Sequence, residues 1–305
     1  MKDLISLHDL TSQEVEDLLK LGLKLKKELK NGIAHPILKG KTLGMIFTKS
    51  STRTRVSFEV GMTQLGGYPL FLSSNDIQLG RGESIHDTAK VLERYLDGIM
   101  IRTYAHSDVI ELAQEANIPV INALTDLLHP CQVLADLMTA YEHKGKLEGL
   151  KLAYIGDGNN MAHSLMYGCA KAGLDCAIAA PKDYQCDAEV IANAKDDFKQ
   201  SGRTLLLTDD PAEAISGAYI VYTDTWVSMG MEDEKEARIK AFEGYCIDKE
   251  LFARAKSDAI FMHCLPAYRG YEVTEDVIDG PQSVIFDEAE NRLHAQKAVM
   301  ATLMG

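Results

Sequence analysis

Apolar and polar positions along this chain change in blocks that predict strands and helices in alternation. From residue 41, short apolar runs typical of buried strands occur at 43–47, 68–72, 98–102 and 118–123. Segments with apolar residues at helical spacing lie near 53–65, 84–96, 107–116 and 130–143. This alternation predicts a parallel sheet with helices on both faces. An earlier helix is expected between the capping box Thr11-Ser12-Gln13-Glu14 and Asn31-Gly32.

A polar, glycine-containing break at 144–149 separates this pattern from a second one. Further strands are predicted at 151–155, 176–180, 204–207, 219–223 and 259–263. The expected fold is therefore α/β with two parallel-sheet domains, the second Rossmann-like. The last helix, near 288–304, is amphipathic, and we expect it to cross back to the first domain. The domains are then 1–145 with the returning segment 288–305, and 146–287.

Composition limits the partners that this chain can have. Its 32 basic and 45 acidic residues give a formal net charge of −13, which argues against binding to nucleic acid or to an anionic membrane surface. An anionic substrate would need a local cationic pocket. The six cysteines contain no C-x-x-C pair and match no zinc spacing, so we expect reduced thiols, no metal and no cofactor.

The N-terminal segment and the apolar runs bear on localisation. Charged and polar residues interrupt the first ten positions, so we expect no signal peptide. No apolar run approaches the ~18 residues of a membrane span. A cytoplasmic protein is the expectation.

Cationic and hydroxyl side chains gather where the first strand of the sheet passes into a helix, at Ser51-Thr52-Arg53-Thr54-Arg55. A helix N-terminus with hydroxyl and guanidinium groups suits a phosphate. The alternative is a polar cap with two surface arginines. We assign phosphate binding to Arg53; Arg55 lies two residues on, faces another side of the helix and is expected to be structural.

Two further strand ends carry candidate groups. Arg102 closes an apolar strand; it is either the first solvated residue or a partner for a substrate oxygen. His129-Pro130-Cys131-Gln132 begins a helix with proline at its first position, so His129 is either a structural cap or a ligand.

The second half offers Gly156-Asp157-Gly158-Asn159-Asn160 directly after a strand. A dinucleotide site is a weak hypothesis here, because Met161 occupies the third glycine position and the next strand lacks an acid at its tip. The asparagines better suit a small polar substrate.

Two later segments complete the set of candidate groups. Asp224 follows a strand and precedes Ser228-Met229-Gly230, while His263-Cys264-Leu265-Pro266 closes another strand. The Leu265–Pro266 bond is a candidate cis peptide. Strand alternation predicts that His263 and Cys264 face opposite sides, which argues against a metal pair.

In this order and spacing, the motifs STRTR, HPCQ, GDGNN, D-x-x-x-SMG and HCLP resemble the aspartate/ornithine carbamoyltransferase family, and the last three resemble its ornithine branch. The resemblance runs through nearly the whole chain, to Phe286–Arg292. It implies transfer of the carbamoyl group of carbamoyl phosphate to the side-chain amine of L-ornithine. The products are L-citrulline and phosphate, within arginine metabolism. It also implies a carbamoyl phosphate-binding first domain, an ornithine-binding second domain, and a homotrimer that shares its sites between subunits and is open to larger assemblies.

The resemblance also assigns roles to individual residues. Those implied for carbamoyl phosphate are Ser51, Thr52, Arg53, Thr54, Arg102, His129, Gln132, Cys264, Leu265 and Arg292, with Gln78 contributed by a neighbouring subunit. Those implied for ornithine are Asn160, Asp224, Ser228 and Met229. The residues implied for catalysis are Arg102, His129 and Cys264.

The reaction needs no covalent enzyme intermediate, but it needs a neutral amine. At pH 8 an amine with a pKa near 10.4 costs ~3 kcal/mol to deprotonate. Asp224 is assigned to binding, since a carboxylate raises the pKa of a neighbouring amine. Cys264 is either a proton acceptor or a group that orients the amine.

Other functions stay open at this point. Putrescine or acetylornithine could replace ornithine, and aspartate is disfavoured by the SMG and HCLP segments. A nicotinamide-dependent dehydrogenase and a non-enzymatic anion-binding protein are the alternatives from other classes. An acceptor screen separates them.

Overall fold

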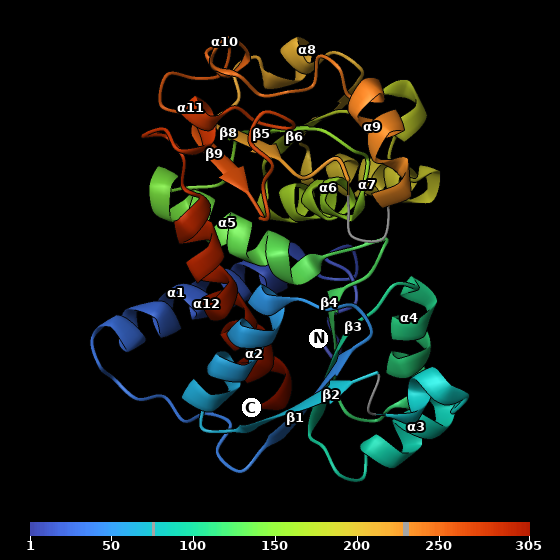
Figure 1. Ribbon diagram of the computed structural model, residues 1–305. Helices are drawn as coiled ribbons and strands as arrows, with labels where there is room; N and C mark the ends of the chain where they lie inside the picture. Colours follow the sequence, from blue (N-terminus) through green and yellow to red (C-terminus); the bar gives the residue numbers. More distant parts are fainter. Residues whose placement is uncertain (75–76, 228–231) are drawn as a thin grey trace. The chain divides into compact units, whose positions relative to one another are not determined.

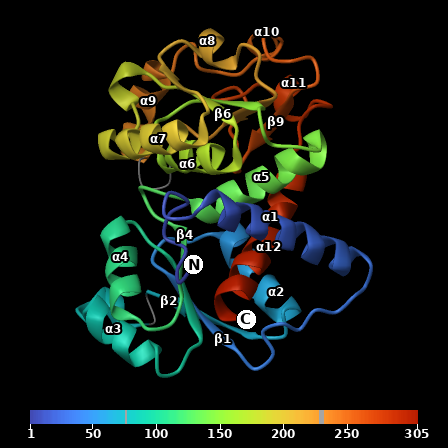
Figure 2. The same ribbon diagram turned by 180° about the vertical axis from the view of Figure 1, so that it is seen from behind.

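The computed structural model describes residues 1–74, 77–227 and 232–305. The chain forms two compact units (Figures 1 and 2). One consists of Met1–Met138 with Glu290–Gly305, and the other of Thr139–Ala289. Each contains its own parallel sheet, as the alternating pattern predicts.

The first unit is built on four parallel strands in the order β2-β1-β3-β4. Their bounds are β1 Thr42–Phe47, β2 Tyr68–Ser73, β3 Gly98–Arg102 and β4 Val120–Leu124. The helices are α1 Ser12–Lys30, α2 Thr52–Gln64, the 3-10 helix η1 Gln78–Arg81, α3 Ile85–Leu92 and α4 His106–Glu115. Helices α3 and α4 cover one face of the sheet, and α1, α2 and α12 lie on the other (Figure 1).

The second unit has five parallel strands in the order β7-β6-β5-β8-β9, the arrangement of a doubly wound sheet. Their bounds are β5 Lys151–Ile155, β6 Asp175–Ala179, β7 Leu205–Thr208, β8 Ile220–Thr223 and β9 Ile260–His263. The longer helices are α6 Asn160–Ala172 and α7 Ala188–Ser201. Shorter ones are η2 Lys182–Tyr184, α8 Pro211–Ile215, η3 Glu232–Glu234, α9 Lys235–Ala241, α10 Lys249–Phe252 and α11 Glu275–Ile278.

Two helices belong partly to each unit. Helix α5 spans Pro130–Lys144 and helix α12 spans Ile285–Met304. The returning helix was predicted and is confirmed, although it begins three residues earlier than expected. Within the first unit, the Lys26 amine donates to the Asn291 side-chain oxygen over 2.8 Å. Gly61 faces Met300, so α12 packs against both α1 and α2.

The predicted start of the first helix is confirmed in detail. Thr11 caps α1 by accepting the Glu14 backbone N–H, and the Glu14 carboxylate accepts the Thr11 backbone N–H in return. Among the described residues, no helix combines the length and the apolar character that a membrane crossing requires.

Candidate functional site

The N-terminus of α2 carries the predicted phosphate segment. Ser51 is its N-cap: the hydroxyl oxygen accepts the Thr54 backbone N–H at 3.2 Å, and the hydroxyl lies 3.1 Å from the Thr54 hydroxyl. Thr54 is fully buried, whereas Thr52 is exposed. The helix runs for 13 residues, so its aligned peptide dipoles favour an anion at this end.

Two arginines from distant parts of the first unit converge on Thr54. Arg102, at the end of β3, lies 3.4 Å from the Thr54 hydroxyl oxygen, and Arg292 of α12 donates to the same oxygen at 2.8 Å. Both arginines are buried. Two guanidinium groups at one neutral oxygen concentrate positive charge at the start of α2, in a chain that is acidic overall.

His129 lies in the electrostatic field of these cations. Burial lowers the pKa of its imidazole well below the ordinary value, and Arg292, Arg102 and Arg53 lower this pKa further. The imidazole is therefore neutral at physiological pH and can donate a hydrogen bond without carrying charge. Its backbone carbonyl accepts the N–H of Gln132 at the start of α5.

Other members of the predicted set show how this region is arranged. Gln132 is fully buried and its amide nitrogen donates to Asp136 over 2.8 Å. Gln78 begins η1 with an exposed side chain. The expected structural role of Arg55 agrees with its contacts, an ion pair with Glu59 at 3.0 Å and a guanidinium stacked 3.7 Å from the ring centroid of Phe71.

Sequence reasoning missed Lys49. It is buried, pairs with Asp126 at 3.5 Å, and contributes to the lowered pKa of His129. Its position between the end of β1 and the cap of α2, two residues from each, is the signal that could have identified it.

In the second unit, polar side chains form a chain of hydrogen bonds across the ends of three strands. The phenol of Tyr154 lies 3.3 Å from the Asn159 side-chain oxygen, and the Asn159 amide nitrogen donates to Asp224 over 3.0 Å. The Cys264 thiol lies 3.1 Å from the other Asp224 oxygen, to which it donates. The structure thus brings Asp224 and Cys264 together. Asn160 begins α6 and is partly buried; Ser228 and Met229 lie outside the described residues.

The backbone after β9 is unusual. The predicted cis Leu265–Pro266 bond is confirmed, and Leu265 has a positive φ of 57°, which is rare for a bulky residue. The Leu265 backbone N–H donates to the His263 Nδ1 over 2.9 Å, and the His263 Nε2 lies 3.3 Å from Glu272.

The prediction that His263 and Cys264 face away from each other is wrong. One ligand atom from each of His263, Cys264 and Asp224 lies within 4.8 Å of the others. Strand alternation does not govern Cys264, because β9 ends at His263. Both ring nitrogens of His263 already have partners, so this geometry leaves the imidazole no nitrogen for a metal.

A buried ion pair also went unpredicted. Arg238 of α9 donates to Asp157 over 2.8 Å, to the backbone carbonyl of Trp226 over 3.1 Å and to Glu234 over 2.9 Å. Burial raises the pKa of Asp157 to about 6, although Arg238 opposes this shift. The pair connects the turn before α6 to the segment after β8.

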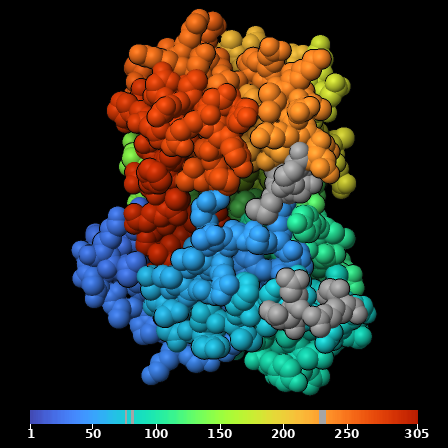
Figure 3. All heavy atoms as spheres, viewed as in Figure 1, coloured from blue at the N-terminus to red at the C-terminus, as the bar shows by residue number. Residues whose placement is uncertain are grey.

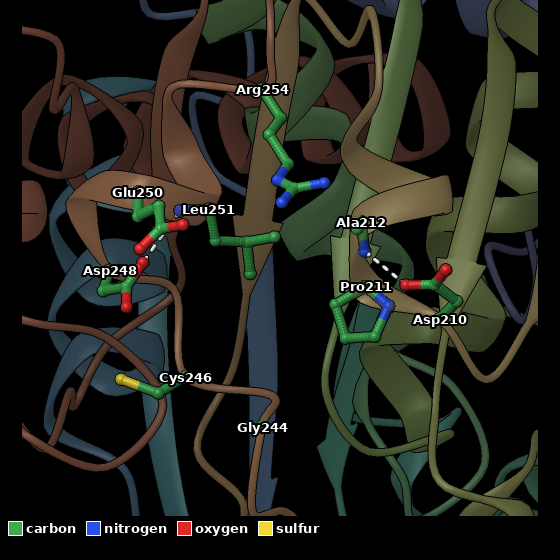
Figure 4. Close-up of a pocket in the computed structure, with 9 residues that line it drawn as sticks. All are labelled: Asp210, Pro211, Ala212, Gly244, Cys246, Asp248, Glu250, Leu251 and Arg254. Atoms are coloured by element: carbon green, nitrogen blue, oxygen red, sulfur yellow. Dashed lines mark hydrogen bonds between the residues drawn. The ribbon is translucent and has the colours of Figure 1, made fainter.

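A pocket of about 310 Å³ lies elsewhere in the second unit. Asp210, which caps α8, and Asp248, which caps α10, stand on opposite sides of it (Figure 4). None of the predicted site residues lines this pocket, so it does not contribute to the chemistry described above.

Comparison with known proteins gives matches over both parts of the chain. Residues 2–142 match the family model described as "Aspartate/ornithine carbamoyltransferase, carbamoyl-P binding domain". Residues 148–303 match the model described as "Aspartate/ornithine carbamoyltransferase, Asp/Orn binding domain".

Individual relatives are similar over their full lengths. The chain is 62% identical over 300 residues to an ornithine carbamoyltransferase of Caldicellulosiruptor saccharolyticus, covering 98% of this chain and 97% of the relative. It is 59% identical over 304 residues to one of Carboxydothermus hydrogenoformans, covering 100% and 98%. Among solved structures, the ornithine carbamoyltransferase from Pyrococcus furiosus has a TM-score of 0.97 at 53% identity, covering 100% of this chain and 97% of that one.

Proposed function

Because the chain belongs to the aspartate/ornithine carbamoyltransferase family, we propose that it transfers the carbamoyl group of carbamoyl phosphate to the side-chain amine of L-ornithine. The products are L-citrulline and phosphate. Residues 1–145, with the returning helix at 288–305, bind carbamoyl phosphate, and residues 146–287 bind ornithine. The main support for carbamoyl phosphate binding is that Arg102 and Arg292 both contact the Thr54 hydroxyl at a helix N-terminus.

The phosphate of the donor is assigned to the start of α2. Ser51, Thr52, Arg53 and Thr54 supply hydroxyl, backbone N–H and guanidinium donors there, and Arg292 adds a second guanidinium. Hydrogen bonds from ionised donors to phosphate are about twice as strong as neutral ones. The same donors stabilise phosphate as it leaves, when its charge increases.

The carbamoyl group is assigned to Arg102, His129 and Gln132. When the amine attacks the carbonyl carbon, the carbonyl oxygen becomes an oxyanion. Donors that are already oriented stabilise such an oxyanion without reorganisation, and removing one donor of this kind typically costs about 3–4 kcal/mol. The low pKa of His129 supports this role, because the imidazole stays neutral near neutral pH and can donate one hydrogen bond to the oxygen.

The acceptor is assigned to Asn160, Asp224, Ser228 and Met229, with Cys264 and Leu265 next to the reacting groups. The Asp224 carboxylate is buried in the second unit and suits a cationic α-amino group. The Cys264 thiol donates to Asp224, and a thiolate this close to a carboxylate would be repelled. This contact favours the second of the two roles expected for Cys264, in which the thiol orients the amine.

A homotrimer with shared sites is also proposed, with Gln78 reaching the phosphate of a neighbouring subunit. Apolar side chains on α2 and on the edge strand β2 support an interface with another copy: Val56 is 51% exposed and Tyr68 63%. In Figure 3, the segments that form α2 and β2 are coloured blue to cyan and lie next to each other at the surface. Light scattering of the purified protein tests the assembly, and a monomeric mass at assay concentration would contradict it.

An acceptor screen with carbamoyl phosphate tests the function. Ornithine, putrescine, acetylornithine and aspartate are compared at equal concentration, and both phosphate and the carbamoylated product are measured. We expect turnover with ornithine, giving citrulline and phosphate in a 1:1 ratio. Preference for another amine would shift the assignment within the family, and absence of product with all four would exclude it.

A further inference from the structure

The side chain of Asn159 serves two partners at once. Its oxygen accepts the backbone N–H groups of Met161 at 2.9 Å and Ala162 at 3.3 Å, which caps α6. Its nitrogen donates to an oxygen of Asp224 at 3.0 Å. A carboxamide has one acceptor atom and one donor atom, so an oxygen committed to the helix forces the nitrogen toward Asp224.

The Asp224 carboxylate is held at both oxygens. One oxygen accepts from Asn159, and the other accepts the Thr225 backbone N–H at 2.8 Å and lies 3.1 Å from the Cys264 thiol. The side chain is buried. These contacts leave the carboxylate a single orientation.

Tyr154 contacts the side-chain oxygen of Asn159. Its hydroxyl lies 3.3 Å from the oxygen of Asn159, and its ring is fully buried against Tyr222, with 6.1 Å between the ring centroids. The two tyrosines are register partners on β5 and β8. The support therefore comes from the centre of the sheet.

We propose that Asn159 is a positioning residue for the acceptor: it orients the Asp224 carboxylate, and Tyr154 holds Asn159 in place. This inference rests on the proposed function, in which Asp224 binds ornithine. It is separable from helix capping, because Ser and Asp cap helices as well as Asn does. Neither replacement presents an N–H to Asp224, and the serine hydroxyl is one atom too short to reach it.

The test compares Asn159→Ser and Asn159→Asp with a matched control, Asp187→Ser. Asp187 caps α7 in the same unit by accepting the Glu189 and Val190 backbone N–H groups. For Asn159→Ser we expect the ornithine KM to rise about tenfold, the usual effect of losing a hydrogen bond to a charged group. The carbamoyl phosphate KM and the melting temperature should match those of the control.

The pH profile of Asn159→Asp gives a readout that a purely structural role would not change. Two adjacent carboxyl groups cannot both ionise easily, so the pKa of one of them is raised. Once it is protonated, its O–H can donate to the other carboxylate as the Asn159 amide does. The deficit of the variant relative to the wild type should therefore shrink as pH falls from 8 to 6. Tyr154→Phe, which keeps the stacked ring, should show a smaller rise in ornithine KM.

Three results would overturn the inference. They are an unchanged ornithine KM in Asn159→Ser, an equal rise in both substrate KM values, and a deficit of Asn159→Asp that does not depend on pH. A wild-type protein without activity toward ornithine would instead remove the proposed function itself. The two failures are therefore distinguishable in one set of assays.

Discussion

Arg292 donates a hydrogen bond to the Thr54 hydroxyl over 2.8 Å, although 238 positions separate the two residues. The contact joins the last helix of the chain to the N-terminus of α2. Helix α12 thus reaches the proposed phosphate site, and its side chains also contact α1 and α2 in the first unit.

Replacing Thr54 by valine removes this contact while keeping the shape of the side chain. Thr54→Val should lower kcat/KM for carbamoyl phosphate about ten- to hundredfold, since a hydrogen bond to a charged group contributes about 1.5–3 kcal/mol. Steady-state kinetics at saturating ornithine measure the effect.

Thr54→Ser is the matched control, because it keeps the hydroxyl and loses only a methyl group. It should retain most of the wild-type kcat/KM. Equal losses in the valine and serine variants would show that the methyl group, rather than the hydroxyl, matters at this position.

His129 should remain neutral where exposed histidines titrate, near pH 6.5. Burial and three arginines lower its pKa, so the folded protein binds this proton only at a pH well below that of the unfolded chain. The protein therefore loses unfolding free energy as pH falls below about 6.5, by up to about 1.4 kcal/mol per pH unit from this residue. NMR of the imidazole nitrogens between pH 5.5 and 8 measures the charge state directly.

A second measurement isolates the contribution of His129 to stability. In His129→Gln, the unfolding free energy from urea titrations should fall less steeply between pH 6.5 and 5 than in the wild type. Since all carboxyl groups are common to both proteins, their contribution cancels in the difference. Parallel curves, or an imidazole that titrates near pH 6.5, would contradict the neutral assignment.

Cys264 provides a third prediction, which separates hydrogen bonding from proton acceptance. Cys264→Ser keeps a donor to Asp224, whereas Cys264→Ala removes it. If the thiol orients the amine, the serine variant should keep more ornithine turnover than the alanine variant, with the same pH profile as the wild type. Binding of carbamoyl phosphate should change little in either.

A different result is expected if Cys264 accepts the proton from the amine. A serine variant as impaired as the alanine variant, with a shifted alkaline limb in the kcat profile, would show that Cys264 accepts the proton. The comparison needs kinetics from pH 6.5 to 10. A thiol can ionise within this range and a serine hydroxyl cannot, so a difference between the two proteins appears there.

Local signals explain how much of the fold could be predicted. Each of the nine strands formed by the described residues lies within two residues of its predicted position, for example 118–123 against Val120–Leu124. Buried parallel strands are continuous apolar runs, so each is visible on its own. The order of strands in each sheet is set by packing between distant segments, and no local pattern contains it.

The candidate site residues were visible in the sequence where a motif follows a strand, as at Ser51 and Asp224. The sequence did not show how these residues contact one another. Asn159 was noted as a polar candidate, but its donation to Asp224 depends on two strands coming together. The convergence of Arg102 and Arg292 on one hydroxyl likewise exists only in the folded chain.

Lys297 carries the last prediction, because its side chain is fully buried in the first unit. Burial lowers the pKa of its amine to about 8, although Glu28 opposes the shift, and the amine donates to Gln64 over 3.0 Å. The unfolded chain holds the proton up to about pH 10.5. Between pH 8 and 10 the unfolded state thus binds more protons than the folded state, so stability from this group rises with pH.

The expected rise is about 1.4 kcal/mol per pH unit above pH 8, which gives about 2 kcal/mol by pH 9.5. Lys297→Met removes the titrating amine, so the unfolding free energy of the variant should show no such rise between pH 7.5 and 9.5. Urea titrations at each 0.5 pH unit across this range measure the difference between the two curves. Lys24→Met is the control, since the Lys24 side chain is 69% exposed and pairs only loosely with Glu28, at 3.8 Å. A rise that persists in Lys297→Met, or that disappears equally in the control, would assign the pH dependence to other groups.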